Sequence, residues 1–216
     1  MSDSAAEIFS RIYRENTWGD PESRSGPGST QARAAEFVPD LVALLTQMRT
    51  RVLLDAACGD FAWAAPMAAA VERYIGVDVV ADLIDRNQRE HARPNRTFIC
   101  ADLAEADLPR ADVILCRDCL VHLSFADIRR TVANFARSGS RLLLTTTFIA
   151  RGRNDDIVTG GWRPIDLQAV PLGWPTPLAL VDERCTHTGG IYRDKRLALW
   201  ELAEVFDGLK PGSGSL

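Results

Sequence analysis

The sequence lacks a long apolar run and an excess of basic residues. No stretch approaches the roughly 18 consecutive apolar residues of a membrane-spanning helix, and the opening residues MSDSAAEIF lack the basic and then apolar profile of a secretory signal. The formal net charge of the 216 residues is -4, which argues against a surface that neutralises nucleic-acid phosphates or anionic lipid. We therefore expect a cytoplasmic protein that acts on a small molecule, with no nucleic-acid or membrane partner.

The cysteines do not form a recognisable framework. Their number, five, is odd, which suits reduced thiols better than a set of disulfides. Cys116 and Cys119 have the spacing of half a zinc site, but no second pair or histidine cluster in the sequence completes four ligands. We interpret both as core thiols.

After residue 50, short apolar runs alternate with helical patterns, which is typical of a parallel sheet with crossover helices. The predicted helices cover 63–72, 81–91 and 125–138, the last capped by Ser124. Two late strands joined by a short polar loop suggest an antiparallel pair. The predicted strands are 51–55, 74–78, 97–100, 113–117, 141–147, 178–183 and 197–202.

Three of these strands end in an acidic residue. The stretch VLLDAACGDFAWAA brings a core strand to Asp55 and then into the tight turn 56–59, Asp78 ends the next strand about 20 residues on, and Asp102 follows the third. Ligands of open parallel sheets bind at the carboxyl ends of strands. Three carboxylates there repel a phosphate-bearing ligand and favour one with a sulfonium, an ammonium and a ribose. Taken singly, each acidic residue has an alternative interpretation, in which it caps the following helix and binds no ligand.

This pattern, from residue 51 to 202, resembles the class I S-adenosylmethionine-dependent methyltransferases, with DAACGDF as a variant of their first motif. The resemblance implies a doubly wound α/β fold, Rossmann-like, whose seven-stranded sheet is mostly parallel with the last strand antiparallel. It also implies S-adenosylmethionine as the cofactor. Ala57 and Phe61 depart from the usual glycines and leave the turn geometry open. The implied donor contacts are Asp55, Ala57 and Gly59 at the methionine end, Asp78 and Val79 at the ribose, Asp102 and Leu103 at the adenine, and Arg117.

The segment before the sheet carries aromatic residues in a polar, glycine-rich context, too polar for a core element. Ser25 and Gly26 open the turn SGPGS, whose successive N–H groups can face an anion such as the methionine carboxylate, and a helical pattern with Arg33 begins near Thr30. We predict that this segment, with Tyr13 and Trp18, is a lid over the donor. The alternative is a flexible leader with a helix cap. The whole arrangement resembles small, mostly uncharacterised bacterial methyltransferases, and more distantly the mycobacterial sugar 1-O-methyltransferase of methylmannose polysaccharide synthesis.

The fourth strand ends in CRDCLVHLSF, at the edge that in this family faces the methyl group and the acceptor. If a helix follows Arg117, the four-residue spacing puts Asp118 and His122 on one face, so that the carboxylate orients the imidazole. Histidine is the natural base for taking a proton from a hydroxyl. The alternative is a buried, satisfied histidine with a structural role.

A loop of almost 30 residues follows the fifth strand. Trp162 and Trp174 favour an ordered lid over disorder, and Asp155, Asp156, Trp162 and Arg163 offer the aromatic and polar groups that bind a sugar or polyol. A capped surface loop has the same composition. Asp118 with Asp155 or Asp156 could also hold magnesium through oxygen ligands.

These observations predict one methyltransferase domain over 1–216 that methylates a hydroxyl oxygen of a small polar acceptor, with a carbohydrate favoured. The alternatives are an N- or carboxyl-directed methyltransferase, a nicotinamide-dependent reductase and a non-catalytic binding module. A homodimer is compatible with the sequence. The predicted segments are a lid at 1–40, a donor-binding core at 51–148, an acceptor loop at 149–177, a strand pair at 178–203 and a mobile tail at 208–216.

Overall fold

The computed structural model describes residues 3–186 and 188–209, so most of the predicted mobile tail, 210–216, lies outside the described residues. The chain divides into two compact units, Met1–Leu103 and Ala104–Leu216. The boundary falls within the predicted donor-binding core, 51–148. Within the described ranges, none of the helices combines the length and apolarity that a membrane span requires.

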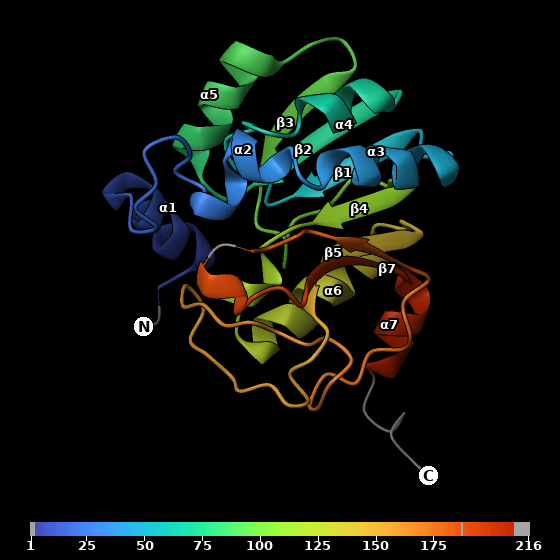
Figure 1. Ribbon diagram of the computed structural model, residues 1–216. Helices are drawn as coiled ribbons and strands as arrows, with labels where there is room; N and C mark the ends of the chain where they lie inside the picture. Colours follow the sequence, from blue (N-terminus) through green and yellow to red (C-terminus); the bar gives the residue numbers. More distant parts are fainter. Residues whose placement is uncertain (1–2, 187, 210–216) are drawn as a thin grey trace. The chain divides into compact units, whose positions relative to one another are not determined.

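The first unit contains a three-stranded parallel sheet in the order β3-β2-β1. Helix α3 packs on α4, and α5 packs on β3 (Figure 1). Asp55 pairs in register with Gly76, and Asp78 with Cys100, so the three acid-bearing strand ends lie at one edge of this sheet, as predicted. The elements are α1 (Ala5–Glu15), η1 (Pro27–Ser29), α2 (Gln31–Ala34), α3 (Val38–Gln47), β1 (Val52–Ala56), α4 (Ala65–Ala70), β2 (Arg73–Asp78), α5 (Ala81–His91) and β3 (Arg96–Cys100).

Two helices of the front segment were not predicted. Helix α1 starts with a capping box in which the Ser4 hydroxyl accepts from the Glu7 N–H and the Glu7 carboxylate accepts from the Ser4 N–H. This S-x-x-E signature is visible in the sequence. Helix α3 buries Leu41 and Leu45 completely or almost so. Helix α3 follows residues 12–37, the stretch interpreted as too polar for a core element, so it lies outside that expectation.

The second unit contains a four-stranded sheet in the order β4-β5-β7-β6. β4 and β5 are parallel, whereas β7 runs antiparallel to both β5 and β6. The fold class is confirmed: seven strands, mostly parallel, with the last one antiparallel and helices alongside. The elements are β4 (Val113–Cys116), η2 (Leu120–His122), α6 (Phe125–Arg137), β5 (Leu142–Phe148), β6 (Ala179–Asp182), η3 (Thr188–Gly190), β7 (Lys195–Glu201) and α7 (Leu202–Gly208).

The long segment between β5 and β6 has no regular helix or strand but packs against the rest of the second unit, to which it belongs (orange in Figure 1). The Asn154 side chain joins two parts of this segment: it accepts a hydrogen bond from the Asp166 N–H at 2.8 Å and donates one to the Asp166 carbonyl at 2.7 Å. Trp174 is buried and packs edge-on against Trp200 with ring centroids 5.2 Å apart. The segment is therefore ordered, as expected, but Trp174 belongs to the core and not to a lid.

Candidate functional site

The tight turn after β1 is held in a conformation that favours glycine. Gly59 has φ of +56°, and Ala57 and Phe61 also have positive φ. A methyl group added to Gly59 would lie 2.4 Å from the Ser25 hydroxyl oxygen. Gly59 is therefore required both by its backbone and by the close approach of the front segment.

Asp78 ties the end of β2 to this turn. Its Oδ2 accepts from the Gly59 N–H and its Oδ1 from the Val80 N–H, both at 3.1 Å. Burial raises the pKa of Asp78, and the backbone N–H groups partly offset that effect. Each carboxylate oxygen carries two acceptor sites, so the same side chain retains capacity for a ribose hydroxyl.

Two serines of the front segment complete the turn. The Ser23 hydroxyl donates to Asp60 Oδ2 at 2.7 Å, and the Asp60 N–H donates to the Ser25 hydroxyl at 3.2 Å. From α5, the Asn87 amide donates to the Gly59 carbonyl at 2.7 Å. Sequence reasoning missed Ser23, Asp60 and Asn87, because no local pattern indicates contacts between residues this far apart in the chain.

The turn SGPGS does not offer the run of N–H groups that the sequence predicted. The Gly26 N–H donates to the Ser23 carbonyl at 3.0 Å and the Ser29 N–H to the Gly26 carbonyl at 2.9 Å. The Ser25 N–H donates to the Ser23 hydroxyl. These three N–H groups have partners within the segment, and the role of the turn toward an anion stays a prediction.

The other predicted lid residues lie in the same front segment. Gly26 is in close contact with Trp18, since a methyl added there would lie 3.4 Å from the Trp18 Cβ. The Arg24 guanidinium lies over the Tyr13 ring at 5.5 Å, and Arg33 pairs with Glu36 at 2.9 Å. Their roles toward a donor stay predictions.

The remaining predicted donor residues follow the strand ends. Asp55 is only 2% exposed and accepts from the Tyr74 hydroxyl at 2.6 Å, so its carboxylate lies within the core. Val79 and Asp102 are partly exposed, whereas Leu103 is buried.

In the second unit, four charged side chains form a buried cluster: Arg117, Asp118, Glu183 and Lys195. The Arg117 Nε and Nη2 atoms both donate to Glu183 Oε2, at 3.0 and 2.6 Å. Lys195 Nζ donates to Asp118 Oδ2 at 2.6 Å and lies 3.2 Å from Glu183 Oε2. Asp118 is the most exposed member, at 26% of its side chain. Arg117 pairs with carboxylates inside this unit, which does not support its predicted donor contact.

His122 is oriented differently from the prediction. Asp118 has φ of +52° and precedes the short 3-10 turn η2, so no helix spans the two residues. The His122 Nδ1 lies 2.7 Å from the Gly161 carbonyl oxygen, and since that oxygen only accepts, Nδ1 carries the proton. Burial lowers the pKa of His122, while the Gly161 hydrogen bond and the Asp118 charge partly offset the effect. The neutral imidazole therefore has its lone pair on Nε2.

The long loop runs beside this histidine. The Gly160 N–H donates to the His122 carbonyl at 2.9 Å, and the Arg163 N–H to the Val121 carbonyl at 3.1 Å. Between them, Trp162 is 45% exposed and packs edge-on with Tyr192 at 5.2 Å. Arg163 is buried, with its guanidinium 5.1 Å from the centre of the Phe125 ring.

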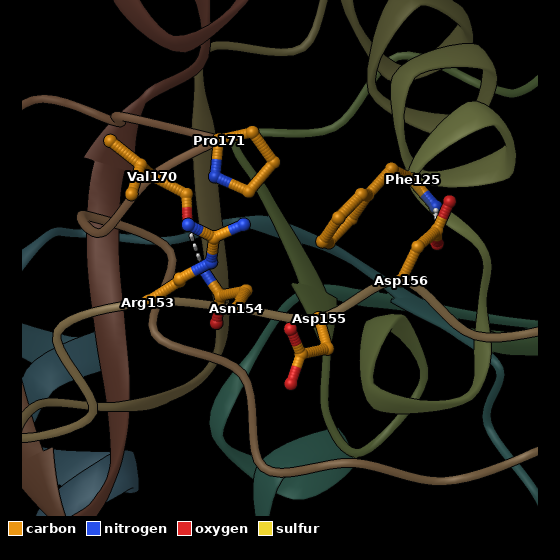
Figure 2. A pocket seen from close by; sticks show the side chains of 7 residues that line it. All are labelled: Phe125, Arg153, Asn154, Asp155, Asp156, Val170 and Pro171. Atoms are coloured by element: carbon orange, nitrogen blue, oxygen red, sulfur yellow. Dashed lines mark hydrogen bonds between the residues drawn. The ribbon is translucent and has the colours of Figure 1, made fainter.

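The two predicted acids of this loop line a pocket of about 270 Å³. Asp156 Oδ1 accepts from the Phe125 N–H at 2.8 Å, and Asp155 lines the pocket beside it (Figure 2). Trp162 and Arg163 do not line it. The full lining is Phe125, Arg153, Asn154, Asp155, Asp156, Val170 and Pro171.

Comparison with known proteins identifies the central part of the chain. Residues 53–139 match the family model described as a methyltransferase domain. These residues form a class I S-adenosylmethionine-dependent methyltransferase domain. Uncharacterised methyltransferases of Mycobacterium bovis and Mycobacterium tuberculosis are 25% identical in an alignment 162 residues long, and the match covers 67% of this chain and 79% of theirs. The match does not support the reductase alternative.

Solved structures share the fold of the methyltransferase. The magnesium protoporphyrin IX methyltransferase of Synechocystis PCC 6803, with bound SAM, has a TM-score of 0.61 at 17% identity, covering 92% of this chain and 97% of that one. The N-methyltransferase NodS of Bradyrhizobium japonicum has a TM-score of 0.54 at 17% identity, covering 76% and 96%.

The residues of the methyltransferase do not fit the predicted magnesium site. The Asp118 carboxylate is already compensated by Lys195 at 2.6 Å and Arg117 at 3.3 Å. Within the described ranges no three His, Cys, Asp or Glu side chains gather as a metal-binding group. We therefore assign no magnesium to Asp118 and Asp155, and Cys116 and Cys119 belong to no such group.

Proposed function

We propose that this protein transfers the methyl group of S-adenosylmethionine to a hydroxyl oxygen of a small polar molecule, with a carbohydrate as the favoured acceptor. The observation that carries the proposal is His122, an imidazole whose Nδ1 proton is held by the Gly161 carbonyl, so that Nε2 is the ring nitrogen on which it can accept a proton.

The Gly59 turn supports the donor assignment. Asp78 can accept a hydrogen bond from a ribose hydroxyl while it holds the Gly59 N–H, and the acids at the strand ends favour a cationic ligand without phosphates. The structural relative from Synechocystis binds SAM. These features all support the same donor.

The chemistry is an in-line displacement at the methyl carbon. The acceptor oxygen forms the new C–O bond as the S–C bond breaks, and the sulfonium becomes a neutral thioether. The hydroxyl proton moves to His122 Nε2, so the positive charge of the donor ends on the imidazolium. Holding the two reactants in line supplies much of the rate, and the base adds about 10²- to 10⁴-fold.

The carbohydrate preference rests on the loop beside His122. Trp162 and Tyr192 present aromatic surface, and Asp155 and Asp156 supply acceptors for hydroxyl groups in the neighbouring pocket. An apolar ring face combined with directed polar groups is what binds a small polar ligand.

An amine acceptor is the second candidate. The exposed Asp155 lines the pocket, and its carboxylate would attract an ammonium group. One structural relative is named an N-methyltransferase. A matched panel of hydroxyl and amino sugars distinguishes the two acceptor classes.

The test is His122→Asn with labelled S-adenosylmethionine and that panel. The asparagine amide can still donate to the Gly161 carbonyl, but it cannot accept the proton as a base. We expect the kcat for hydroxyl sugars to fall about 10²- to 10⁴-fold, while calorimetry shows unchanged donor affinity.

His91→Asn is the control, because His91 is a histidine of α5 in the first unit, and it should keep wild-type turnover. Undiminished turnover in His122→Asn would show that His122 is structural. Methylation of amines alone would replace the hydroxyl proposal with the amine one.

A further inference from the structure

We propose that Trp162 is a specificity-determining residue of this methyltransferase. Its indole is the platform on which the acceptor stacks, so the acceptor is a cyclic molecule with a flat apolar face and not an open-chain polyol. This inference rests on the proposed function, because the ring that stacks is the one that carries the methylated hydroxyl. A pyranose sugar is the favoured ring, and an aromatic ring presents the same kind of face.

The backbone on both sides of Trp162 is fixed beside His122. The Gly160 N–H donates to the His122 carbonyl at 2.9 Å, and the Arg163 N–H donates to the carbonyl of the residue before His122 at 3.1 Å. Between them, the Gly161 carbonyl oxygen lies 2.7 Å from His122 Nδ1. The indole therefore projects from the same four residues of the loop that orient the proposed base.

Two further rings hold the indole. Trp162 packs edge-on against Tyr192, with ring centroids 5.2 Å apart, and against Phe148 at 6.3 Å. Phe148 and Tyr192 also pack edge-on against each other at 5.8 Å. An aromatic side chain that is held in this way offers a large contact area and loses little conformational entropy when a ligand binds.

Arg151 joins these supporting rings to the chain around them. Its guanidinium lies 5.4 Å from the centre of the Phe148 ring and 5.8 Å from that of the Tyr192 ring. Its Nη2 donates to Asp194 Oδ1 at 2.8 Å and to the Ile191 carbonyl at 2.9 Å. The rings that support the indole are therefore fixed before any acceptor binds.

Trp162 stays 45% exposed in spite of these contacts, whereas Trp174 of the same loop is 4% exposed and Phe148 is 2% exposed. Ligand sites combine apolar and aromatic surface with a few polar groups, and the acids Asp155 and Asp156 belong to the same loop. A ring with polar substituents and an apolar face can use both kinds of group. An open-chain polyol has no fixed face to stack.

The first experiment compares Trp162→Leu with Trp162→Phe in the full chain. The acceptors are the hydroxyl sugars of the panel, the alditol made by reducing each sugar, and phenol as the aromatic ring. We expect Trp162→Leu to raise the KM for the sugars about 10-fold through lost stacking, with kcat nearly unchanged because stacking stabilises ground and transition states equally. Trp162→Phe should keep most of the affinity, and the KM for the alditols should not change.

The second experiment detects the contact without methyl transfer. The indole N–H resonance of Trp162, assigned by NMR with Trp162→Phe, should shift when a sugar is added to wild-type protein saturated with S-adenosylhomocysteine. The alditol at the same concentration should leave it in place. Val158→Ala is the matched control, because it removes apolar surface from an 85%-exposed residue of the same loop. It should change neither KM nor the shift.

The outcomes distinguish the two proposals. A Trp162 resonance that no cyclic compound shifts, or an equal rise in KM for sugar and alditol, overturns the stacking platform. A fall in kcat without a rise in KM also overturns it, because this would mean that Trp162 only maintains the loop that orients His122. A shifted resonance in a protein that methylates amines alone supports the platform and refutes the proposed function. A shift and turnover with phenol alone keep the platform and replace the pyranose with an aromatic ring.

Discussion

At the scale of single residues, Gly59 connects backbone conformation to donor binding. Gly59→Ala places a methyl group where the Ser25 hydroxyl now lies, 2.4 Å away, at φ of +56°. We expect it to reduce the free energy of unfolding by about 1–3 kcal/mol and to weaken binding of S-adenosylhomocysteine, measured by denaturant titration and calorimetry.

Gly173→Ala distinguishes the effect of backbone strain from that of a steric clash. Gly173 has φ of +60°, close to that of Gly59, but an added methyl meets nothing within 4 Å. It should therefore cost stability through backbone strain alone and leave ligand affinity intact. Equal affinity losses in the two variants would contradict the proposed importance of the Ser25 contact.

At the scale of elements, the front segment carries the prediction of a lid. Ser23 and Ser25 contact Asp60 across the turn that follows β1. If the segment closes over the donor, residues 10–33 should gain protection from hydrogen exchange when S-adenosylhomocysteine is added. The double variant Ser23→Ala/Ser25→Ala should lose that gain and bind the ligand about tenfold more weakly, which corresponds to one or two lost hydrogen bonds.

Ser4→Ala is the control for this element. It removes the capping box of α1 and should loosen that helix by about 1 kcal/mol without changing ligand affinity. If residues 10–33 show the same exchange with and without ligand, the segment is not a lid over the donor.

At the scale of the whole molecule, stability depends on pH through buried ionisable groups. Burial lowers the folded-state pKa of His122 below the usual histidine value of about 6.5, so the unfolded chain binds more protons than the folded one in the range just below that value. The unfolding free energy should therefore fall as pH drops from about 7 to 5. The pKa of Asp118 is also depressed in the folded state, which adds a further loss below about pH 4.

Urea titrations of wild type and His122→Asn across this range check the assignment. The pKa of His91 is also lowered by burial, and burial raises the pKa of Asp78, but both groups are present in the two proteins and cancel in the comparison. The wild-type stability should decline more steeply between pH 6.5 and 5 than that of the variant. Parallel curves would mean that the pKa of His122 is not depressed.

The sequence by itself determined the alternation of strands and helices, the acids at three neighbouring strand ends and the family. Each depends on a short-range pattern: apolar runs define strands, and parallel strands bring their carboxyl ends to one edge. The boundaries of the predicted strands differ from the observed ones. The last strand was predicted at 197–202, but Leu202 begins helix α7, and the strand starts at Lys195, because a polar residue at a strand start gives no apolar signal.

The tertiary structure alone decided which side chains meet. Lys195 reaches Asp118 across 77 residues, Ser23 reaches Asp60 across 37, and Gly161 orients His122 across 39. The sequence assigned the orientation of His122 to Asp118, four residues away, because only local spacing is visible along a chain. Hydrogen bonds and ion pairs between distant residues depend on strand order and loop packing, and these arise only when the chain buries its apolar surface.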